Sequence, residues 1–590
     1  MNLKKLVICF AGIMTLAYSN VPSSTIHRPN VPYWMESLYF QSMQTKIFSS
    51  DVSGMVIDRY TDLHWNPAYI LSQKQKTLYL DHNFWTENAD IEVEPFYLGN
   101  YYDDLVVLPR WYSQTSINQV TTTPLYNIAF MMPLTSKITI GLFNRSIFDY
   151  GPFRSTAWWM YGGWRNSDLY DMESMSGFEP DRLEVDENQQ TVLGTQSEVV
   201  LGYRFSNKID IGLRLGHYIF SRVGDLYDSK WANYPHSSFA DLNDESLDID
   251  GNHIELGLGL LYHMNKTTHM SIYGSLSKGR GDEEMVSIDT SDSWSEKDND
   301  PSYYSISDFT LESDNVYSSD GTKPAIALTF EKEISDKFVF RSFFSSTGSN
   351  IDLSGSIASE DTSYADRTYD DYYGGNYYFR RRESHSSHQS GLDGKGTEET
   401  NQWRWFASLI YRPDDDWSLF GGIQIKKYSF KRKVEEISDY TNHSFTEYTL
   451  YDPGTIRYYR MYHKIYSFKS NYDEWMLYLP IGVKANIANG LQVILGTNIV
   501  FTLTDQDSNG KLLYPTKISK RWENGYVEVE DIETNRYEEF TSSPAKIFNR
   551  RMDQCFGVVY HHSSGAKLFI RSAGDIFDTN NWALGFEMNW

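Results

Sequence analysis

Large apolar and polar residues alternate strictly over the last nine residues of the chain. The even positions are Trp582, Leu584, Phe586, Met588 and Trp590, whereas the odd positions carry Ala, Gly, Glu and Asn. Side chains on a β-strand alternate between its two faces, so the pattern predicts a terminal strand with one apolar and one polar face. The same period of two recurs through most of the chain.

The alternation recurs in seven pairs of segments, each joined by a short turn. The pairs are 128–132 with 138–142, 199–205 with 209–215, 254–264 with 270–272, 326–330 with 338–344, 403–411 with 417–425, 475–483 with 491–499, and 556–560 with 568–570. Tight turns favour antiparallel pairing. With a first strand near Leu78 and the terminal strand, the pattern predicts about 16 strands, and 14 is the alternative count.

The connections between these hairpins are much longer than the turns inside them. They cover roughly 148–196, 221–251, 279–322, 347–401, 427–473 and 504–551, and are rich in Asp, Ser, Tyr and Gly. Short turns on one side and long loops on the other are typical of a transmembrane antiparallel β-barrel, with the long loops extracellular. A soluble β-sandwich explains neither this asymmetry nor the apolar outward faces. We therefore predict an all-β transmembrane barrel with short periplasmic turns.

The aromatic end of the chain resembles the C-terminal signature of bacterial outer-membrane barrels. In such proteins an alternating apolar C-terminal strand serves as the membrane-insertion signal and pairs with the first strand. The resemblance implies these roles for Trp582–Trp590. The resemblance implies the outer membrane of a Gram-negative cell. It also implies outer-membrane lipid, lipopolysaccharide and the barrel-assembly machinery as partners. We expect the closing seam to lie against the first strand near Leu78.

The first 19 residues have the features of a signal peptide. Lys4 and Lys5 precede an apolar run from Leu6 to Ala17, and Ala17-Tyr18-Ser19 supplies small residues for cleavage. We predict export, with domains at 1–19 (signal peptide), 20–75 (plug segment) and 76–590 (barrel).

Residues 20–75 lack sustained alternation and contain the tripeptide Asn66-Pro67-Ala68 shortly before the first strand. From the residues alone this is a turn leading into that strand. The Asp-rich turn followed by Asn-Pro-Ala resembles the N-terminus of FadL-type fatty-acid transporters. The resemblance implies that the segment packs inside or beneath the barrel as a small plug.

The polar face of the predicted strands carries charges of both signs. The lumen and selectivity candidates are Arg204, Asp210, Arg214, Glu255, His263, Glu331, Arg341, Arg404, Lys426, Lys484 and Glu587. Charges inside a barrel either set selectivity or pair across a filled interior, and the sequence leaves both alternatives open. A mixed polar interior differs from the apolar pocket that the FadL resemblance implies.

Composition narrows the function classes. A net charge of −25 excludes a nucleic-acid partner, which requires clustered Lys and Arg. Beyond the signal peptide, Cys555 is the only cysteine, which excludes an internal disulfide. No nucleophile elbow, zinc-protease, P-loop or dinucleotide motif is present, so we expect no enzyme and no cofactor.

One motif suggests a cation. Asp505, Asp507 and Asn509 precede Gly510, as in the first half of a calcium loop, although Thr516 replaces the usual Glu. The alternative is a turn-rich loop without metal.

Two functions fit this pattern. The leading hypothesis is a porin-like channel or transporter for passive uptake of small solutes, hydrophobic ones among the candidates. The alternative is a surface receptor or adhesin whose barrel anchors Tyr- and Asp-rich extracellular loops.

Overall fold

The computed structural model describes most of the chain from Asp58 onward. It describes residues 58–83, 126–151, 181–234, 236–297, 300–373, 376–414, 416–449, 453–533, 536–541, 545–573 and 582–590. The predicted signal peptide and residues 20–57 lie outside the described residues.

The described residues form two short helices and 18 strands. The helices are α3 (Arg59–Trp65) and η3 (Pro67–Ser72). The strands are β1 (Thr77–Asn83), β2 (Tyr126–Pro133), β3 (Ile138–Gly151), β4 (Asp181–Ser206), β5 (Ile209–Tyr234), β6 (Ser237–Asn265), β7 (Thr268–Lys297), β8 (Asp300–Ser335), β9 (Phe338–Tyr373), β10 (Asn376–Tyr411), β11 (Trp417–Thr449), β12 (Gly454–Ala488), β13 (Leu491–Glu523), β14 (Tyr526–Glu533), β15 (Arg536–Thr541), β16 (Ala545–His561), β17 (Ala566–Ala573) and β18 (Trp582–Asn589).

Antiparallel pairing closes 16 of these strands into a ring. Each strand from β1 to β13 pairs with the next, β13 continues to β16, and β18 pairs with β1. The remaining strands, β14 and β15, pair with the far end of β13 beside β16. The predicted barrel and its count of 16 strands are therefore confirmed.

The predicted hairpins and closing seam are also confirmed. All seven pairs of apolar segments form hairpins joined by the predicted short turns. At the seam Leu78 lies opposite Met588 in the register, and Thr77 lies opposite Asn589. The Trp590 amide donates to the Lys76 carbonyl at 3.0 Å, so the ladder continues to the last residue.

The outward face of the ring is apolar and bordered by aromatic side chains. Leu258, in the middle of the β6 apolar run, is 60% exposed. Near the short turns Phe338 stacks on Tyr411 at 4.7 Å between ring centroids, and farther along Trp403 contacts Trp475 edge-to-face at 5.5 Å. Trp403 and Tyr411 are eight positions apart, which corresponds to about 20 Å of height on a tilted strand. This band matches the hydrocarbon layer that we predict it to face.

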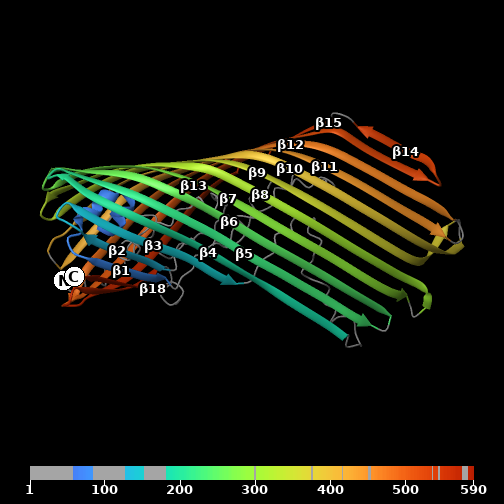
Figure 1. Cartoon of the computed structure of the whole chain (residues 1–590), viewed down its shortest axis with the longest axis horizontal. Helices are drawn as coiled ribbons and strands as arrows, with labels where there is room; N and C mark the ends of the chain where they lie inside the picture. The colour runs from blue at the N-terminus through green and yellow to red at the C-terminus, as the bar shows by residue number, and fades with distance from the viewer. Residues whose placement is uncertain are drawn as a thin grey trace.

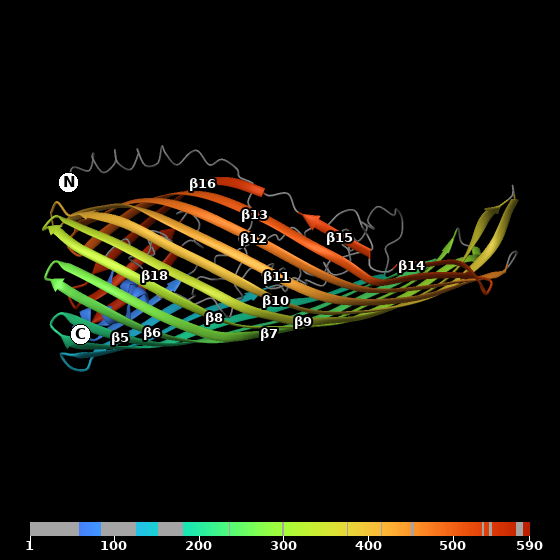
Figure 2. The ribbon, with the colours of Figure 1, turned by 90° about the horizontal axis from the view of Figure 1, so that it is seen from above.

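The segments predicted as long loops are mostly strand. Strands β4–β13 are 26 to 36 residues long, whereas a membrane crossing needs about ten. They therefore continue far past the Trp403–Trp475 contact, beyond the ends of β16 and β18 (Figure 2). We name the part of β4–β13 beyond this contact the extension. The two helices lie at the opposite, short-turn end (Figure 1).

The extension holds together through polar and aromatic cross-strand pairs. Ser287 and Ser313 hydroxyls lie 2.9 Å apart, and Tyr440 stacks on Tyr462 at 5.1 Å. Such pairs stabilise a sheet without an apolar face. The apolar period therefore ends before the strands do, and for that reason the sequence pattern predicted loops here.

Among the described residues, none of the helices has the length and apolar character needed to cross a membrane.

Candidate functional site

The N-terminal insert, residues 58–72, is built from two capped helical turns. The Asp58 carboxylate accepts a hydrogen bond from the Tyr60 amide at 3.2 Å and caps α3. The Asn66 side-chain oxygen accepts from the Ala68 amide at 2.8 Å and caps η3, and Pro67 occupies the first helical turn. Asp, Asn and Pro are favoured in these places because they satisfy or remove unpaired amides.

Asn66 also connects the insert to the barrel wall. Its side-chain amide donates to the Leu260 carbonyl at 3.1 Å and to the Ile272 carbonyl at 3.0 Å. Both acceptors belong to neighbouring wall strands, β6 and β7. A single asparagine therefore shapes the insert and attaches it. Pro67 and Ala68 beside it are buried.

Three glycines make room for the insert on the inward face. Gly202, Gly212 and Gly259 lie side by side in the register of β4, β5 and β6. We name them the glycine row. A Cβ atom at Gly212 would lie 2.2 Å from the Ala68 nitrogen, and one at Gly259 would lie 2.1 Å from the Asn66 oxygen. Only residues without a side chain permit this approach.

A buried ion pair joins the insert to a second part of the wall, at β9, four strands along the ring from β5. Asp62 of α3 contacts Arg341 of β9, and their side chains are 0% and 1% exposed. Burial removes both charges from water, so this contact compensates a large desolvation cost. The insert is therefore held by charge at β9 and by close backbone packing at β4–β6.

Arg214 of β5 binds the end of α3. Its guanidinium donates to the carbonyls of Leu63 and His64, the second at 2.9 Å. The last carbonyls of a helix lack partners within it, and a cation satisfies them favourably. Arg214 also donates to the Tyr273 hydroxyl at 3.3 Å.

Carboxylates of the wall surround Arg214. Glu198 and Glu255 lie 3.8 and 3.9 Å from it. Glu198 also pairs with Arg145 at 2.7 Å, and the Tyr273 hydroxyl donates to Glu255 at 2.7 Å. Charges of opposite sign thus alternate across β3–β6 beneath the insert, and the Tyr273 hydroxyl of β7 ends the series.

Arg404 of β10 covers an aromatic contact of the insert. Its guanidinium carbon lies 4.2 Å from the centre of the Trp65 ring and 4.9 Å from that of Phe343. The two rings meet edge-to-face at 4.8 Å. Arginine over an aromatic face is a favourable cation–π arrangement, stronger when shielded from water.

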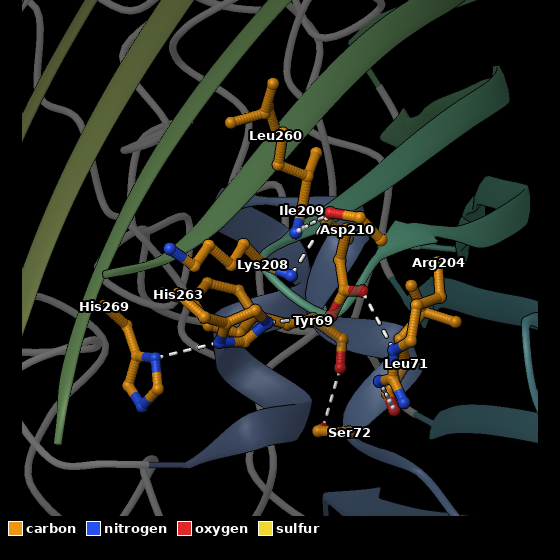
Figure 3. A network of polar contacts seen from close by, with 12 residues as sticks. Tyr69, Leu71, Ser72, Arg204, Lys208, Ile209, Asp210, Leu260, His263 and His269 are labelled. Atoms are coloured by element: carbon orange, nitrogen blue, oxygen red, sulfur yellow. Dashed lines mark hydrogen bonds and ion pairs between the residues drawn. The ribbon is translucent and has the colours of Figure 1, made fainter. Parts of the chain in front are cut away.

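A second polar network lies beside η3 (Figure 3). Arg204 donates to Asp210 at 3.0 Å and to the Leu71 carbonyl at 3.4 Å. His263 contacts the other Asp210 oxygen at 3.0 Å, and its second nitrogen lies 2.9 Å from a His269 nitrogen. One of these two facing imidazole nitrogens must accept the shared hydrogen, so at least one ring is neutral.

All eleven predicted lumen residues lie on the inward face. Four arginines contact the insert directly, namely Arg204, Arg214, Arg341 and Arg404. Asp210, Glu255 and His263 take part in the networks behind them. Glu331, Lys426, Lys484 and Glu587 share the inward face from β8, β11, β12 and β18, where Lys567 lies 2.8 Å from Glu587.

Sequence reasoning missed several members of the site. It did not single out Asp62, Arg145, Glu198 or Tyr273, and it did not use the glycine row. Glycine at matching inward positions of three successive strands was the available signal, because such a row indicates another segment packed against the wall.

The predicted calcium loop is not formed. Asp505, Asp507 and Asn509 lie on β13, where alternate side chains stand side by side and cannot surround an ion. Asp505 pairs with Lys546 at 3.0 Å, and Asp507 accepts from Asn471 at 3.2 Å. In the part of the chain that the structure describes, no group of three His, Cys, Asp or Glu residues is placed to hold a metal ion.

No protein-family model and no curated protein matches the sequence. Solved structures that resemble the chain include a Pseudomonas aeruginosa FadL homologue, with 8% identity, a TM-score of 0.30, and coverage of 92% of this chain and 97% of that one. The ferric-catecholate import receptor Fiu from E. coli K12 matches at 9% identity and a TM-score of 0.24, covering 79% of each chain. The outer membrane transporter YddB from Escherichia coli matches at 8% identity and a TM-score of 0.20, and the match covers 88% of this chain and 81% of that one.

A FadL homologue is thus among the structures that the chain resembles. The likeness is distant, and the barrel is established by the strand pairings of this chain itself. The likeness to these structures assigns no role to any residue of this chain.

Proposed function

We propose that the protein is an outer-membrane channel or transporter for small solutes, closed by the N-terminal insert and opened when the insert moves. The observation that carries the proposal is the enclosure of the insert by the wall. It contacts the glycine row of β4–β6 and Arg341 of β9. A ring of 16 strands is wide enough to contain a passage once such a segment moves.

The contacts of the insert are both polar and apolar. Asn66, Asp62 and the α3 carbonyls bind wall groups through hydrogen bonds and ion pairs. Water can replace the partners of the hydrogen bonds at modest net cost. Moving the insert would also expose the buried side chains of Ile70 and Leu71 and separate the buried Asp62–Arg341 pair. We therefore expect the insert to leave its enclosed position only rarely.

The wall around the insert favours polar solutes over hydrophobic ones. Arg145, Glu198, Arg214 and Glu255 form one continuous charged surface beneath it. Moving the insert would uncover these charges to solvent. A hydrophobic solute that passes these charges would displace water from them and offer no hydrogen bonds in its place.

Planar-bilayer recordings of purified protein test the proposal. We expect brief, rare openings from the full chain and a larger, persistent conductance after deletion of residues 20–75. This deletion ends before β1 and leaves the β1–β18 seam intact. Heat-dependent gel migration checks that both proteins are folded barrels. Absence of conductance from both folded proteins would overturn the proposal.

A further inference from the structure

The outward face of the extension carries a row of ring and cationic side chains. One residue from each of β9–β13 lies next to its neighbour in the register, in the order Tyr364, His385, Phe445, Arg457 and Trp522. These positions share the face of Trp403 and Trp475 by strand alternation, whereas Glu398 and Arg432 lie buried on the inner face. The row therefore faces outside the barrel.

The rings and cations of this row contact one another. Tyr364 and His385 have ring centroids 4.8 Å apart, and the Arg457 guanidinium lies 5.3 Å from the centre of the Phe445 ring. In the next row His443 and Tyr459 lie 4.9 Å apart. Packed rings lose little side-chain freedom on binding, so they form a preorganised platform.

A groove of about 770 Å³ lies over this platform. Its lining includes His385, His443, Phe445, Arg457, Tyr459 and Trp522. The turn between β13 and β14 closes one end, where the Asn524 side chain accepts from the Thr455 amide at 2.9 Å. Asn524 and Gly525 both have positive φ, at 49° and 83°, as a two-residue hairpin turn requires.

The charge of the groove differs from that of the chain. The whole sequence has 78 acidic and 53 basic residues, yet the lining contains one arginine, two histidines and no carboxylate. Acidic side chains border the groove in the next row of the same face, where Asp366, Glu383 and Glu447 lie side by side in the register. Glu383 lies 3.2 Å from His385. A negatively charged ligand would meet the cations of the lining itself, and the acidic row would limit how far it extends in that direction.

The groove lies far above the membrane band. Arg457 lies 18 positions along β12 from Trp475 at the upper aromatic border. At about 3.3 Å per residue and a tilt near 40°, this is about 45 Å of height. Lipid headgroups do not reach that level, so the occupant comes from the outer medium or from long surface polymers.

We propose that this groove binds an acidic oligosaccharide taken from the medium. The aromatic faces of Phe445, Tyr459 and Trp522 carry negative charge density that attracts the C–H faces of sugar rings. Arg457 offers a planar fork that matches a carboxylate, and the histidines add further donors. The volume of the groove lies in the normal range for ligand sites and is large enough for several linked sugar rings. The inference is independent of solute transport through the barrel.

Calorimetry on the purified full-length barrel in detergent tests the binding, with tetragalacturonate as the probe. Maltotetraose supplies the rings without the charge, and tetraglutamate supplies the charge without the rings. We expect tetragalacturonate to bind at least tenfold more tightly than either. Absence of tetragalacturonate binding, or equal binding of either comparison compound, would overturn the proposal.

Variants assign the binding to this groove. Arg457→Gln and Trp522→Ala should each weaken tetragalacturonate binding at least tenfold. Arg460→Gln is the matched control, because Arg460 is an exposed arginine on the same strand but on the opposite face. It should change affinity less than twofold, and a loss equal to that of Arg457→Gln would refute the site. Heat-dependent gel migration checks the folding of each variant.

A competition experiment identifies the source of the sugar. Long-chain polysaccharide purified from the surface of the native cell is titrated against bound tetragalacturonate. We expect no displacement at equal sugar concentration. Displacement would overturn the assignment to the medium and make the cell's own coat the ligand.

Discussion

Substitution of Gly212 by alanine tests whether the wall is shaped for the N-terminal insert. The added Cβ would lie 2.2 Å from the Ala68 nitrogen and 2.3 Å from the Pro67 carbonyl carbon. Ordinary contacts of a Cβ atom begin near 3.4 Å, so the overlap exceeds 1 Å. Both clashing atoms are backbone, and Gly212 is fixed between Gly202 and Gly259 in the sheet. The insert must therefore move.

The expected magnitude follows from two contributions. Overpacking of a tight contact costs about 1–3 kcal/mol. Displacement also weakens the two hydrogen bonds from Asn66 to the wall. Because water partly replaces them, this loss costs about 1 kcal/mol of free energy in total. The sum of roughly 2–4 kcal/mol would shift the equilibrium between enclosed and released insert about 30- to 700-fold.

Gly216→Ala is the matched control, because Gly216 lies on the same strand and the same face. A Cβ there would meet only side-chain atoms at 3.5 Å and beyond, which is ordinary contact. The change in unfolded-chain entropy is the same for both substitutions and cancels in the comparison. The two variants therefore differ only in the clash with the insert.

Limited proteolysis between residues 58 and 72 and bilayer conductance measure the effect. We expect Gly212→Ala to be cut faster and to open more often than the wild-type protein, and Gly216→Ala to behave like wild type. Wild-type protection and conductance in Gly212→Ala, or equal changes in both variants, would refute the enclosed position of the insert.

Three further predictions concern other parts of the chain. Asp62→Asn should destabilise the enclosed insert by about 3–5 kcal/mol and raise channel opening, because Arg341 loses its charge partner; adding Arg341→Gln should reverse part of this, and additive effects in the recordings would contradict the pairing. Leu258→Arg should lower the free energy of unfolding in lipid vesicles by about 2–4 kcal/mol, whereas Ile437→Arg, equally outward but in the extension, should change it little; equal losses would contradict the membrane band. Burial raises the pKa of Glu398, which lies in the extension, to about 8; this carboxyl stays protonated in the folded protein where the unfolded chain has ionised, so stability falls as pH rises toward 8, and the infrared band of protonated acid at pH 7 should lose intensity in Glu398→Gln, while Glu283, with a pKa of about 7, keeps part of it.

The apolar period carried most of the barrel prediction. Each strand that crosses the membrane must carry an apolar side chain at every second position, as at Leu256, Leu258 and Leu260. This requirement applies to each strand separately. It therefore located the hairpins and the seam between Leu78 and Met588. The same period placed the predicted lumen residues on the inward face.

The extension could not be predicted in this way. Its strands have polar residues on both faces, as in the stacked Tyr440 and Tyr462, so no apolar period marks them. They are strands because neighbouring long strands supply hydrogen-bond partners for most of their backbone amides. The predicted loop at Asp505–Asn509 became strand for the same reason.

The sequence by itself determined the barrel, because alternation is a local pattern that each strand displays alone. Only the tertiary structure decided what the barrel encloses. Asp62 meets Arg341 across 279 positions of sequence, and Asn66 reaches the Leu260 carbonyl across 194. Such contacts depend on the closure of the ring, which brings residues from distant strands around one short segment. The glycine row indicates that some segment packs there, but no local pattern in the sequence records which contacts it makes.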